Sequence, residues 1–341
     1  MPTNRLIFPT KNSMIEMDYF YKEGLDYVNL ENCNICPRKC GVDRYERAGY
    51  CGAKAAIKAA KAMIHQGEEP CIGGQGQANA HGDGSAAARS GAGAIFFTGC
   101  NLRCVFCQNY EISWEQQGWE ISEERLGEIM LELQSQGAAC IDLVTPTPYS
   151  IQIKTALEAV KPKLHVPVVY NCGGYEEPEA LRQLDGLIDV YLPDLKYYDR
   201  AIAARYSGCA DYFEKASTAL QEMYRQVGAA QFDEGGQMLK GLLVRHLVLP
   251  GAYKDSMKLM EHLGEAFPPG SIRISLMSQY TPFGRVLQNP AEFKEINRRV
   301  TTFEYNKVID RALQCGLDGY SQQRSSSTMA LRPSFDGSGI L

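Results

Sequence analysis

The sequence predicts an α/β fold, a partial (β/α)6 barrel of parallel strands preceded by a small N-terminal cysteine-rich region. Two observations predict it. Between residues 94 and 316, runs of β-branched and apolar residues alternate with segments of helical periodicity, as in parallel sheets with helices outside. Ahead of this stretch the chain is rich in turn residues, and eight of its 12 cysteines fall before residue 108.

Composition limits the class of protein. With 341 residues, 45% of them hydrophobic, the chain can bury a sizeable core. A net charge of -5 and no basic run interleaved with aromatics argue against nucleic acid as a partner. No signal sequence and no 18-residue apolar run are found, so we expect a cytoplasmic protein without membrane contact. In that reducing compartment, clustered cysteines favour metal binding over disulfides, which makes the N-terminal region a metal-binding one.

Three segments are expected along the chain. Residues 1–90 form the cysteine-rich region and a flexible connector, residues 91–316 the barrel, and residues 317–341 a tail without a recognised motif. The connector is a Gly, Ala and Ser stretch from Gly73 to Gly93.

Six strands are predicted from runs of β-branched and apolar residues. They are Ala94–Thr98, Cys140–Val144, Val166–Asn171, Ile188–Leu192, Leu242–Leu249 and Ile272–Met277. Side chains with catalytic or binding roles should lie at their carboxyl ends.

Helices are predicted between these strands. The first begins at Ser122, an N-cap followed by two glutamates, and has apolar residues at helical spacing. Similar apolar stripes begin at Ile153, Met257 and Val308, and Gly316 ends the last of them. These stripes are interpreted as core.

Cys100, Cys104 and Cys107 lie in the loop that follows the first predicted strand. Three thiolates so spaced can hold one [4Fe-4S] cluster and leave one iron without a protein ligand. That open position separates a reactive cluster from an electron carrier closed by four cysteines. A zinc site would need a fourth Cys or His nearby, and the nearest upstream histidine, His81, lies in the connector.

With Phe106, these cysteines form the pattern Cys-x3-Cys-x-aromatic-Cys, by which the chain resembles the radical S-adenosylmethionine superfamily. The resemblance implies that S-adenosylmethionine binds the open iron. An electron from the cluster then splits it into methionine and a 5'-deoxyadenosyl radical, which takes hydrogen from a substrate. It also implies a low-potential reductant such as flavodoxin or ferredoxin.

Over residues 94–285 the resemblance narrows to the pyruvate formate-lyase activating enzymes. Asp194-Leu-Lys196 matches their Asp-Leu-Lys segment, and Arg245 matches a residue that reaches the carboxylate of the cofactor. Its neighbour His246 points to the opposite face of the strand and is interpreted as structural.

Four further positions are assigned to cofactor binding by the same resemblance. Thr145 opens a Thr-Pro-Thr-Pro run where many members carry Gly-Gly-Glu, a departure that leaves the contact with the methionyl amine to a hydroxyl or a carbonyl. Asn171 stands after the third strand, Tyr280 after the sixth, and Asn109 beside the cysteine loop.

A second cysteine motif, Cys33, Cys36, Cys40 and Cys51, has four thiols and so indicates a closed site. Structural zinc and an auxiliary [4Fe-4S] cluster both fit, and both would stabilise a region without a core of its own. The spacing is not that of a ferredoxin run, so no electron-relay role follows. Some uncharacterised relatives of the activating enzymes show a similar leading motif.

The leading functional hypothesis is an enzyme that cleaves S-adenosylmethionine reductively and activates a glycyl-radical protein. The same radical chemistry could instead modify a peptide or a small metabolite. A different class, a non-catalytic iron-sulfur electron carrier, is disfavoured by the three-cysteine loop. The sequence does not indicate which substrate is used.

Overall fold

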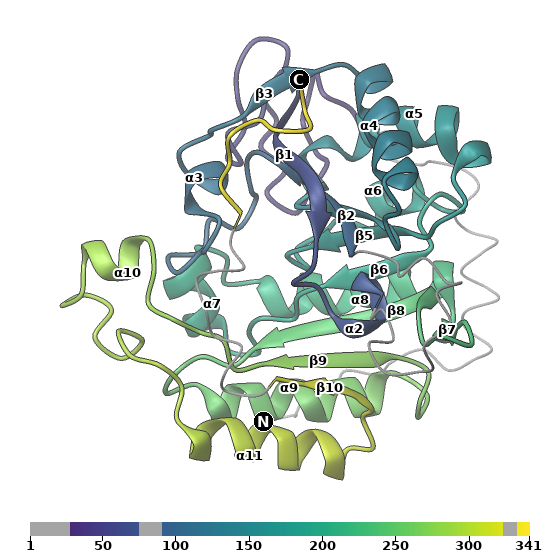
Figure 1. The fold of residues 1–341 in the computed structure, drawn as a ribbon. Coiled ribbons are helices and arrows are strands. Elements are labelled where there is room, and N and C mark those ends of the chain that lie inside the picture. The colour runs from purple at the N-terminus through teal and green to yellow at the C-terminus, as the bar shows by residue number, and fades with distance from the viewer. Residues whose placement is uncertain (1–27, 75–90, 323–332) are drawn as a thin grey trace, which may run out of the picture.

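The computed structural model describes residues 28–74, 91–322 and 333–341. Its strands form a ten-stranded sheet in the order β10-β9-β8-β6-β5-β4-β2-β1-β3, with β7 paired to β8. Helices α4, α5 and α6 lie along one part of this curved sheet, and α9 and α11 lie side by side against another part (Figure 1).

Six strands at the centre of the sheet run parallel and follow one another in chain order. This is the topology of a partial (β/α)6 barrel, and the predicted fold class is confirmed. Each predicted strand is present, with small shifts at its ends. The strands are β2 Ala92–Phe97, β4 Ile141–Val144, β5 Val168–Cys172, β6 Val190–Pro193, β8 Met238–Leu247 and β9 Arg273–Met277.

Four shorter or peripheral strands extend the sheet beyond the prediction. β1 Ile57–His65 pairs antiparallel with β2, and β3 Trp119–Ile121 pairs with β1. β10 Gly319–Ser321 adds a parallel edge to β9, and β7 Gln231–Phe232 pairs with β8. The domain boundary near residue 90 stays a prediction, and most of the predicted connector lies outside the described residues.

The predicted helices occur where expected. α4 Glu123–Ser135 begins at Ser122, whose hydroxyl accepts a hydrogen bond from the Arg125 backbone N–H at 3.1 Å. The other expected helices are α5 Ser150–Val160, α9 Tyr253–Ala266 and α11 Thr302–Gln314. Helices outside the prediction are α2 Pro70–Gly73, α3 Tyr110–Ser113, α6 Pro178–Arg182, α7 Arg200–Ser207, α8 Tyr212–Val227, α10 Arg285–Gln288 and the 3-10 turns η1 Thr147–Tyr149 and η2 Lys161–Lys163.

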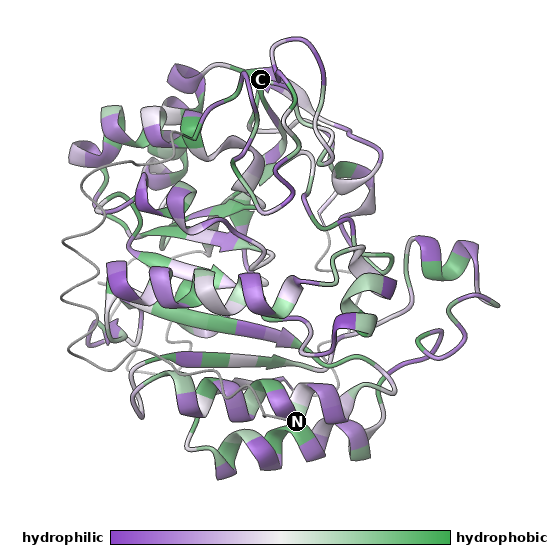
Figure 2. Ribbon diagram, turned by 180° about the vertical axis from the view of Figure 1, so that it is seen from behind, coloured by the Kyte–Doolittle hydropathy of each residue, from purple (hydrophilic) through white to green (hydrophobic). Residues whose placement is uncertain are grey.

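The two faces of the sheet carry different side chains. In β4, Ile141 and Leu143 pack in the large core against the helices. Asp142 and Val144 therefore point to the inner face, because successive strand residues alternate. The parallel register places Val144 beside Phe96 and Asn171. The central strands are largely apolar with isolated polar positions, as Figure 2 shows, and among these Asn171, Arg245 and Ser275 line a cavity in the barrel.

Helix α2 closes the amino end of the barrel. Its residues Cys71 and Ile72 are buried in a small apolar cluster with the first residues of several strands, among them Ala92 and Val190. The Ile72 carbonyl accepts hydrogen bonds from the Cys140 thiol at 3.4 Å and the Gln237 amide at 3.2 Å. The segment that joins β1 to α2 is not part of the parallel strands, and it lies against the amino end of the barrel.

The C-terminal residues pack on β1. The Ala62 N–H donates to the Ser338 carbonyl at 3.1 Å, and the Gly337 N–H donates to the Ala60 carbonyl at 3.0 Å. Ile340 is fully buried in the main core. Within the described residues, no helix combines the length and apolar character needed to cross a membrane.

Candidate active site

The loop between β2 and α3 brings Cys100, Cys104 and Cys107 together at the carboxyl end of β2. The Cys107 N–H donates to the Cys104 carbonyl at 3.2 Å, which tightens the loop. Two serine hydroxyls donate to its sulfurs, Ser207 to Cys104 at 2.9 Å and Ser113 to Cys107 at 3.3 Å. These donors stabilise thiolates.

The same three thiols fit an iron-sulfur cluster. Burial and the neighbouring Cys104 and Cys107 raise the pKa of Cys100 to about 12. Mutual repulsion of this kind is relieved when thiolates bind iron. Three adjacent thiols with hydrogen-bond donors are therefore the donor set that a [4Fe-4S] cluster requires.

A fourth thiol, Cys209, lies behind the loop. Burial and the nearby Cys104 raise its pKa to about 12. Its side chain is packed in the main core and does not line the cavity that Cys104 and Cys107 face. In the sequence this cysteine stands apart from both cysteine motifs.

A cavity of about 440 Å³ opens beside the loop, inside the barrel. Apolar walls are provided by Phe96, Val144, Leu247 and Met277. Of the residues predicted from sequence to form the site, this cavity brings together Cys104, Cys107, Asn109, Asn171, Asp194, Lys196 and Arg245.

Ion pairs join these polar groups into one network. Asp194 accepts from Lys196 at 2.5 Å and from the Arg245 Nε at 3.1 Å. Arg245 also donates to the Asn171 side-chain oxygen, and Asn171 donates to Asp142 at 3.1 Å. Burial disfavours the charged carboxylate, yet Lys196 and Arg245 together hold the pKa of Asp194 below its usual value.

Two predicted residues lie elsewhere. Tyr280 is buried behind the cysteine loop, where its ring meets Phe106 edge-on at 5.7 Å and its hydroxyl donates to the Ile296 carbonyl. Thr145 has a left-handed φ of 62° and does not line the cavity. His246, as expected, turns away from the cavity, and its Nδ1 meets the Leu195 carbonyl at 2.6 Å.

Two acidic residues of the cavity were not predicted from the sequence. Glu68 and Glu69, between β1 and α2, line it together with His65. A Glu68 oxygen lies 3.5 Å from the Arg245 guanidinium and the other lies 3.8 Å from the His65 ring. Their only sequence signal is a charged pair before Pro70, which is usually found on the surface.

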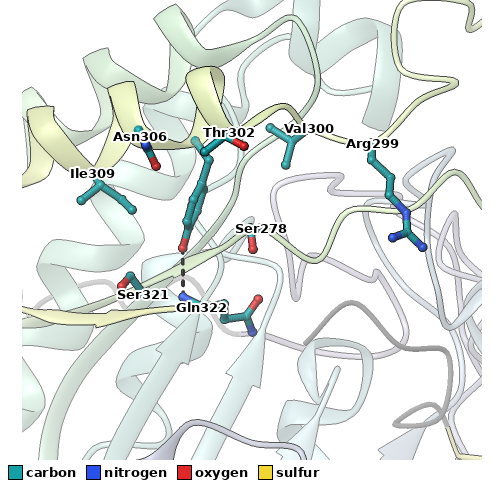
Figure 3. A pocket seen from close by; sticks show the side chains of 9 residues that line it. Ser278, Arg299, Val300, Thr302, Asn306, Ile309, Ser321 and Gln322 are labelled. Atoms are coloured by element: carbon teal, nitrogen blue, oxygen red, sulfur yellow. Dashed lines mark hydrogen bonds between the residues drawn. The ribbon is translucent and has the colours of Figure 1, made fainter. Parts of the chain in front are cut away.

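A second cavity adjoins the first. Ser321 and Gln322 line both, and the Gln322 amide donates to Gln279 of the first cavity at 3.2 Å. In Figure 3, Asn306 and Ile309 of α11 face Ser321 and Gln322, while Arg299 stands apart. The Tyr305 hydroxyl accepts from the Gln322 backbone N–H at 2.9 Å. The lining groups are neutral apart from Arg299.

The second cysteine motif also forms one cluster of thiols. Cys33, Cys36, Cys40 and Cys51 line a small pocket together with Arg38 and Arg44. Arg38 reaches the loop of Cys100, Cys104 and Cys107, where it donates to the Asn101 carbonyl at 2.9 Å and to the nearby Ser207 carbonyl at 3.0 Å.

The two cysteine loops touch directly. The Cys100 N–H donates to the Cys51 carbonyl at 3.2 Å. Gly99 makes this approach possible, because it has a φ of 91° and a Cβ there would lie 2.8 Å from the Cys51 oxygen. No group of three or more His, Cys, Asp or Glu side chains in the described residues is arranged to hold a single metal ion.

Comparisons with known proteins give a related sequence, similar solved structures and a match to a protein family. The uncharacterized protein MJ0674 of Methanocaldococcus jannaschii is 26% identical over 328 residues, which cover 89% of this chain and 85% of that protein. The solved structure of Streptococcus suis SuiB bound to precursor peptide SuiA is 13% identical, with a TM-score of 0.47, and covers 70% of this chain.

The match to SuiB covers 51% of the SuiB chain, so this chain spans about half the length of SuiB. The solved structure of a spore photoproduct lyase mutant is 10% identical, with a TM-score of 0.44, and the match covers 66% of this chain and 74% of the lyase chain. In sequence, residues 94–228 match the radical SAM superfamily. The matched range contains the loop with three cysteines, most of β2 and the strands β4, β5 and β6, and over this range the chain is similar to the radical SAM superfamily.

Proposed function

We propose that this enzyme cleaves S-adenosylmethionine reductively, with Cys100, Cys104 and Cys107 as the ligands of its [4Fe-4S] cluster. The observation that carries the proposal is the position of the loop, whose Cys104 and Cys107 line a buried cavity with paired charges. When bound, the cluster supplies the electron that releases methionine and a 5'-deoxyadenosyl radical, and this radical removes hydrogen from the substrate.

The residues of the cavity suit the polar end of S-adenosylmethionine. Lys196 and Arg245 are the cations available for its carboxylate, and Asp194 and Asn171 provide oxygen acceptors for its amine. Asn109 lies next to the loop and is a further polar contact. Phe96, Val144 and Met277 keep water from the reacting atoms, which a carbon radical requires.

The second cysteine motif suits structural zinc or an auxiliary [4Fe-4S] cluster, because its four thiols share one pocket and both groups take four thiolate ligands. The contact between Cys51 and Cys100 would place either group beside the loop of Cys100, Cys104 and Cys107.

A reductant such as flavodoxin or ferredoxin would supply the electron in the cytoplasm. All 12 cysteines are free thiols, which suits that reducing compartment. Activation of a glycyl-radical protein is one form of the proposed chemistry. A glycine brings no charge of its own, however, so the charged cavity favours a second form, in which a peptide or small metabolite with an ionic group is modified.

The first test is anaerobic reconstitution with iron and sulfide, reduction with dithionite and detection of 5'-deoxyadenosine after S-adenosylmethionine is added. We expect the nucleoside to form, and Cys104→Ala to abolish it. Cys315→Ala is the matched control, because this cysteine lies on the far side of the sheet after α11. Cleavage by Cys104→Ala at the wild-type rate would refute the ligand assignment.

Cys209 distinguishes the enzyme from an electron carrier. If it closed the cluster as a fourth ligand, no iron would remain open for S-adenosylmethionine. We expect Cys209→Ser to retain the iron of the wild type and to form 5'-deoxyadenosine. Loss of iron in this variant, together with no nucleoside from the wild type, would support the carrier.

A further inference from the structure

The floor of the cavity lies at the end away from the cysteine loop. It is formed by Glu68 and Glu69, directly above helix α2, which closes the amino end of the barrel. Neither residue belongs to the parallel strands, and both precede the range that matches the superfamily, residues 94–228. The floor therefore lies outside the range that matches the superfamily.

Negative charge is in excess at this floor. Four carboxyl groups, those of Glu68, Glu69, Asp142 and Asp194, act on Arg245, and Lys196 is the second base of the network. Arg245 and Lys196 both contact Asp194, and Arg245 reaches Glu68 at 3.5 Å. Glu69 has no ion pair within 4.0 Å among the described residues. Burial raises the pKa of Glu68 and of Glu69, although the Arg245 guanidinium lowers both.

The unpartnered atoms of the cavity wall are all acceptors. Glu69 is only 9% exposed, and its Oε2 has no hydrogen-bond partner among the described residues. The Gln322 Oε1, on the wall shared with the second cavity, is also without a partner there. A buried carboxylate oxygen without a donor is costly. A ligand that brings N–H donors and positive charge would remove that cost.

We propose that the floor of this cavity binds an alkylammonium group of the substrate through Glu69 and Glu68. This inference rests on the proposed function and names the substrate class. An ammonium is compact and has three donors, which suits two adjacent carboxylates. With the cation at the floor, the carbon chain of the substrate extends toward the cysteine loop, where hydrogen would be removed.

The test measures binding, not turnover. Isothermal titration of the anaerobically reconstituted protein compares n-butylammonium with n-butanol, which has a similar shape and no charge. We expect butylammonium to bind and butanol to bind at least tenfold more weakly. Glu69→Gln should weaken butylammonium at least tenfold, while Glu234→Gln, an exposed carboxylate in a turn, should bind as the wild type does.

Thermal unfolding separates this role from a structural one. Because Glu69 has an unpartnered oxygen, Glu69→Gln should leave Tm unchanged or raise it when no amine is present. Lower Tm with unchanged amine affinity would overturn the proposal, as would equal affinity for butanol. Since no S-adenosylmethionine is added, a failure here is independent of whether 5'-deoxyadenosine is formed.

The source of the ammonium is decided by two peptides. An acetylated tetrapeptide with one lysine is compared with its Nε-acetyl-lysine form, and with free butylammonium. Binding of the lysine peptide and not of the acetylated one would assign a peptide side chain. Binding of butylammonium alone would assign a free amine metabolite, and binding of neither would refute the inference.

Discussion

At the scale of single residues, the site depends on side chains shared between partners. Asp194 holds Lys196 and Arg245 at once, so both cations keep fixed positions before a cofactor arrives. Ser207 links the two cysteine motifs, because its hydroxyl donates to Cys104 and its carbonyl accepts from Arg38, which lies between Cys36 and Cys40 in the chain. A hydroxyl donor to a cluster ligand is a means of tuning the reduction potential.

Glu176 should make stability depend on pH. Burial raises its pKa from 4.5 to about 8, although hydrogen bonds from side chains such as Thr147 and Tyr170 lower it. The folded chain then keeps a proton that the unfolded chain releases, so this contribution is complete below about pH 4.5 and is lost as pH rises through about 8. We expect Glu176→Gln to remove that decline, measured as the free energy of unfolding in urea at several pH values.

Glu128→Gln is the control for this measurement, since Glu128 is exposed and pairs with Arg125 on the surface of α4. It should retain the wild-type decline. If Glu176→Gln shows the same decline as the wild type, the titrating group lies elsewhere.

How well single residues could be predicted depended on their place in the chain. Asn171, Asp194 and Arg245 were found because each follows or lies on a predicted parallel strand, and strand ends meet at one mouth. Tyr280 was assigned by position alone, and its ring is used to support the cysteine loop. Glu69 could not be found, because its environment is made by a segment inserted from outside the barrel.

At the scale of elements, the six mainly apolar strands of the barrel were predicted, and the four shorter or peripheral strands were not. β1 is mainly Ala and Lys, residues that strands disfavour, and it forms because β2 and the C-terminal residues pair with it. α8 was not predicted although it buries Leu220, Met223 and Val227 at helical spacing. Tertiary contacts supplied what local propensity lacked.

Deleting residues 333–341 should destabilise the chain. The deletion exposes the edge of β1 and removes the buried Ile340 and Phe335, each worth about 1.5 to 3 kcal/mol. We expect a clear fall in Tm by calorimetry. The substitution Leu341→Ala, at a residue 79% exposed, should leave Tm unchanged. An unchanged Tm after the deletion would show that β1 is equally stable without residues 333–341.

At the scale of the whole molecule, the two cysteine sites form one unit across a hydrogen bond from Cys100 to Cys51. Arg38 of the N-terminal motif binds the Asn101 carbonyl in the loop of Cys100, Cys104 and Cys107 and the Ser207 carbonyl beside it, so the motif and the loop lie on the same side of the barrel. Metal at the first motif should therefore support the local fold, while the radical cluster depends on its own three thiols.

Cys36→Ala tests that division. With an auxiliary cluster at the first motif, iron should fall from about eight to about four atoms per chain, and Tm should fall, because closed metal sites contribute folding energy. Cleavage of S-adenosylmethionine should persist. A variant that keeps Tm but loses all cleavage would reverse the assignment of the two sites, and zinc in the wild type would replace the auxiliary cluster.

The closure of the barrel by α2 sets an order of events. Because this helix lies at the amino end, we expect a molecule to reach Glu69 from the opposite end, past the level of Lys196 and Arg245, where the proposed site for S-adenosylmethionine lies. If both proposals hold, the substrate loads before the cofactor covers it, and the product leaves last. Steady-state kinetics would then be sequential and ordered, and excess S-adenosylmethionine would inhibit turnover by trapping the empty enzyme.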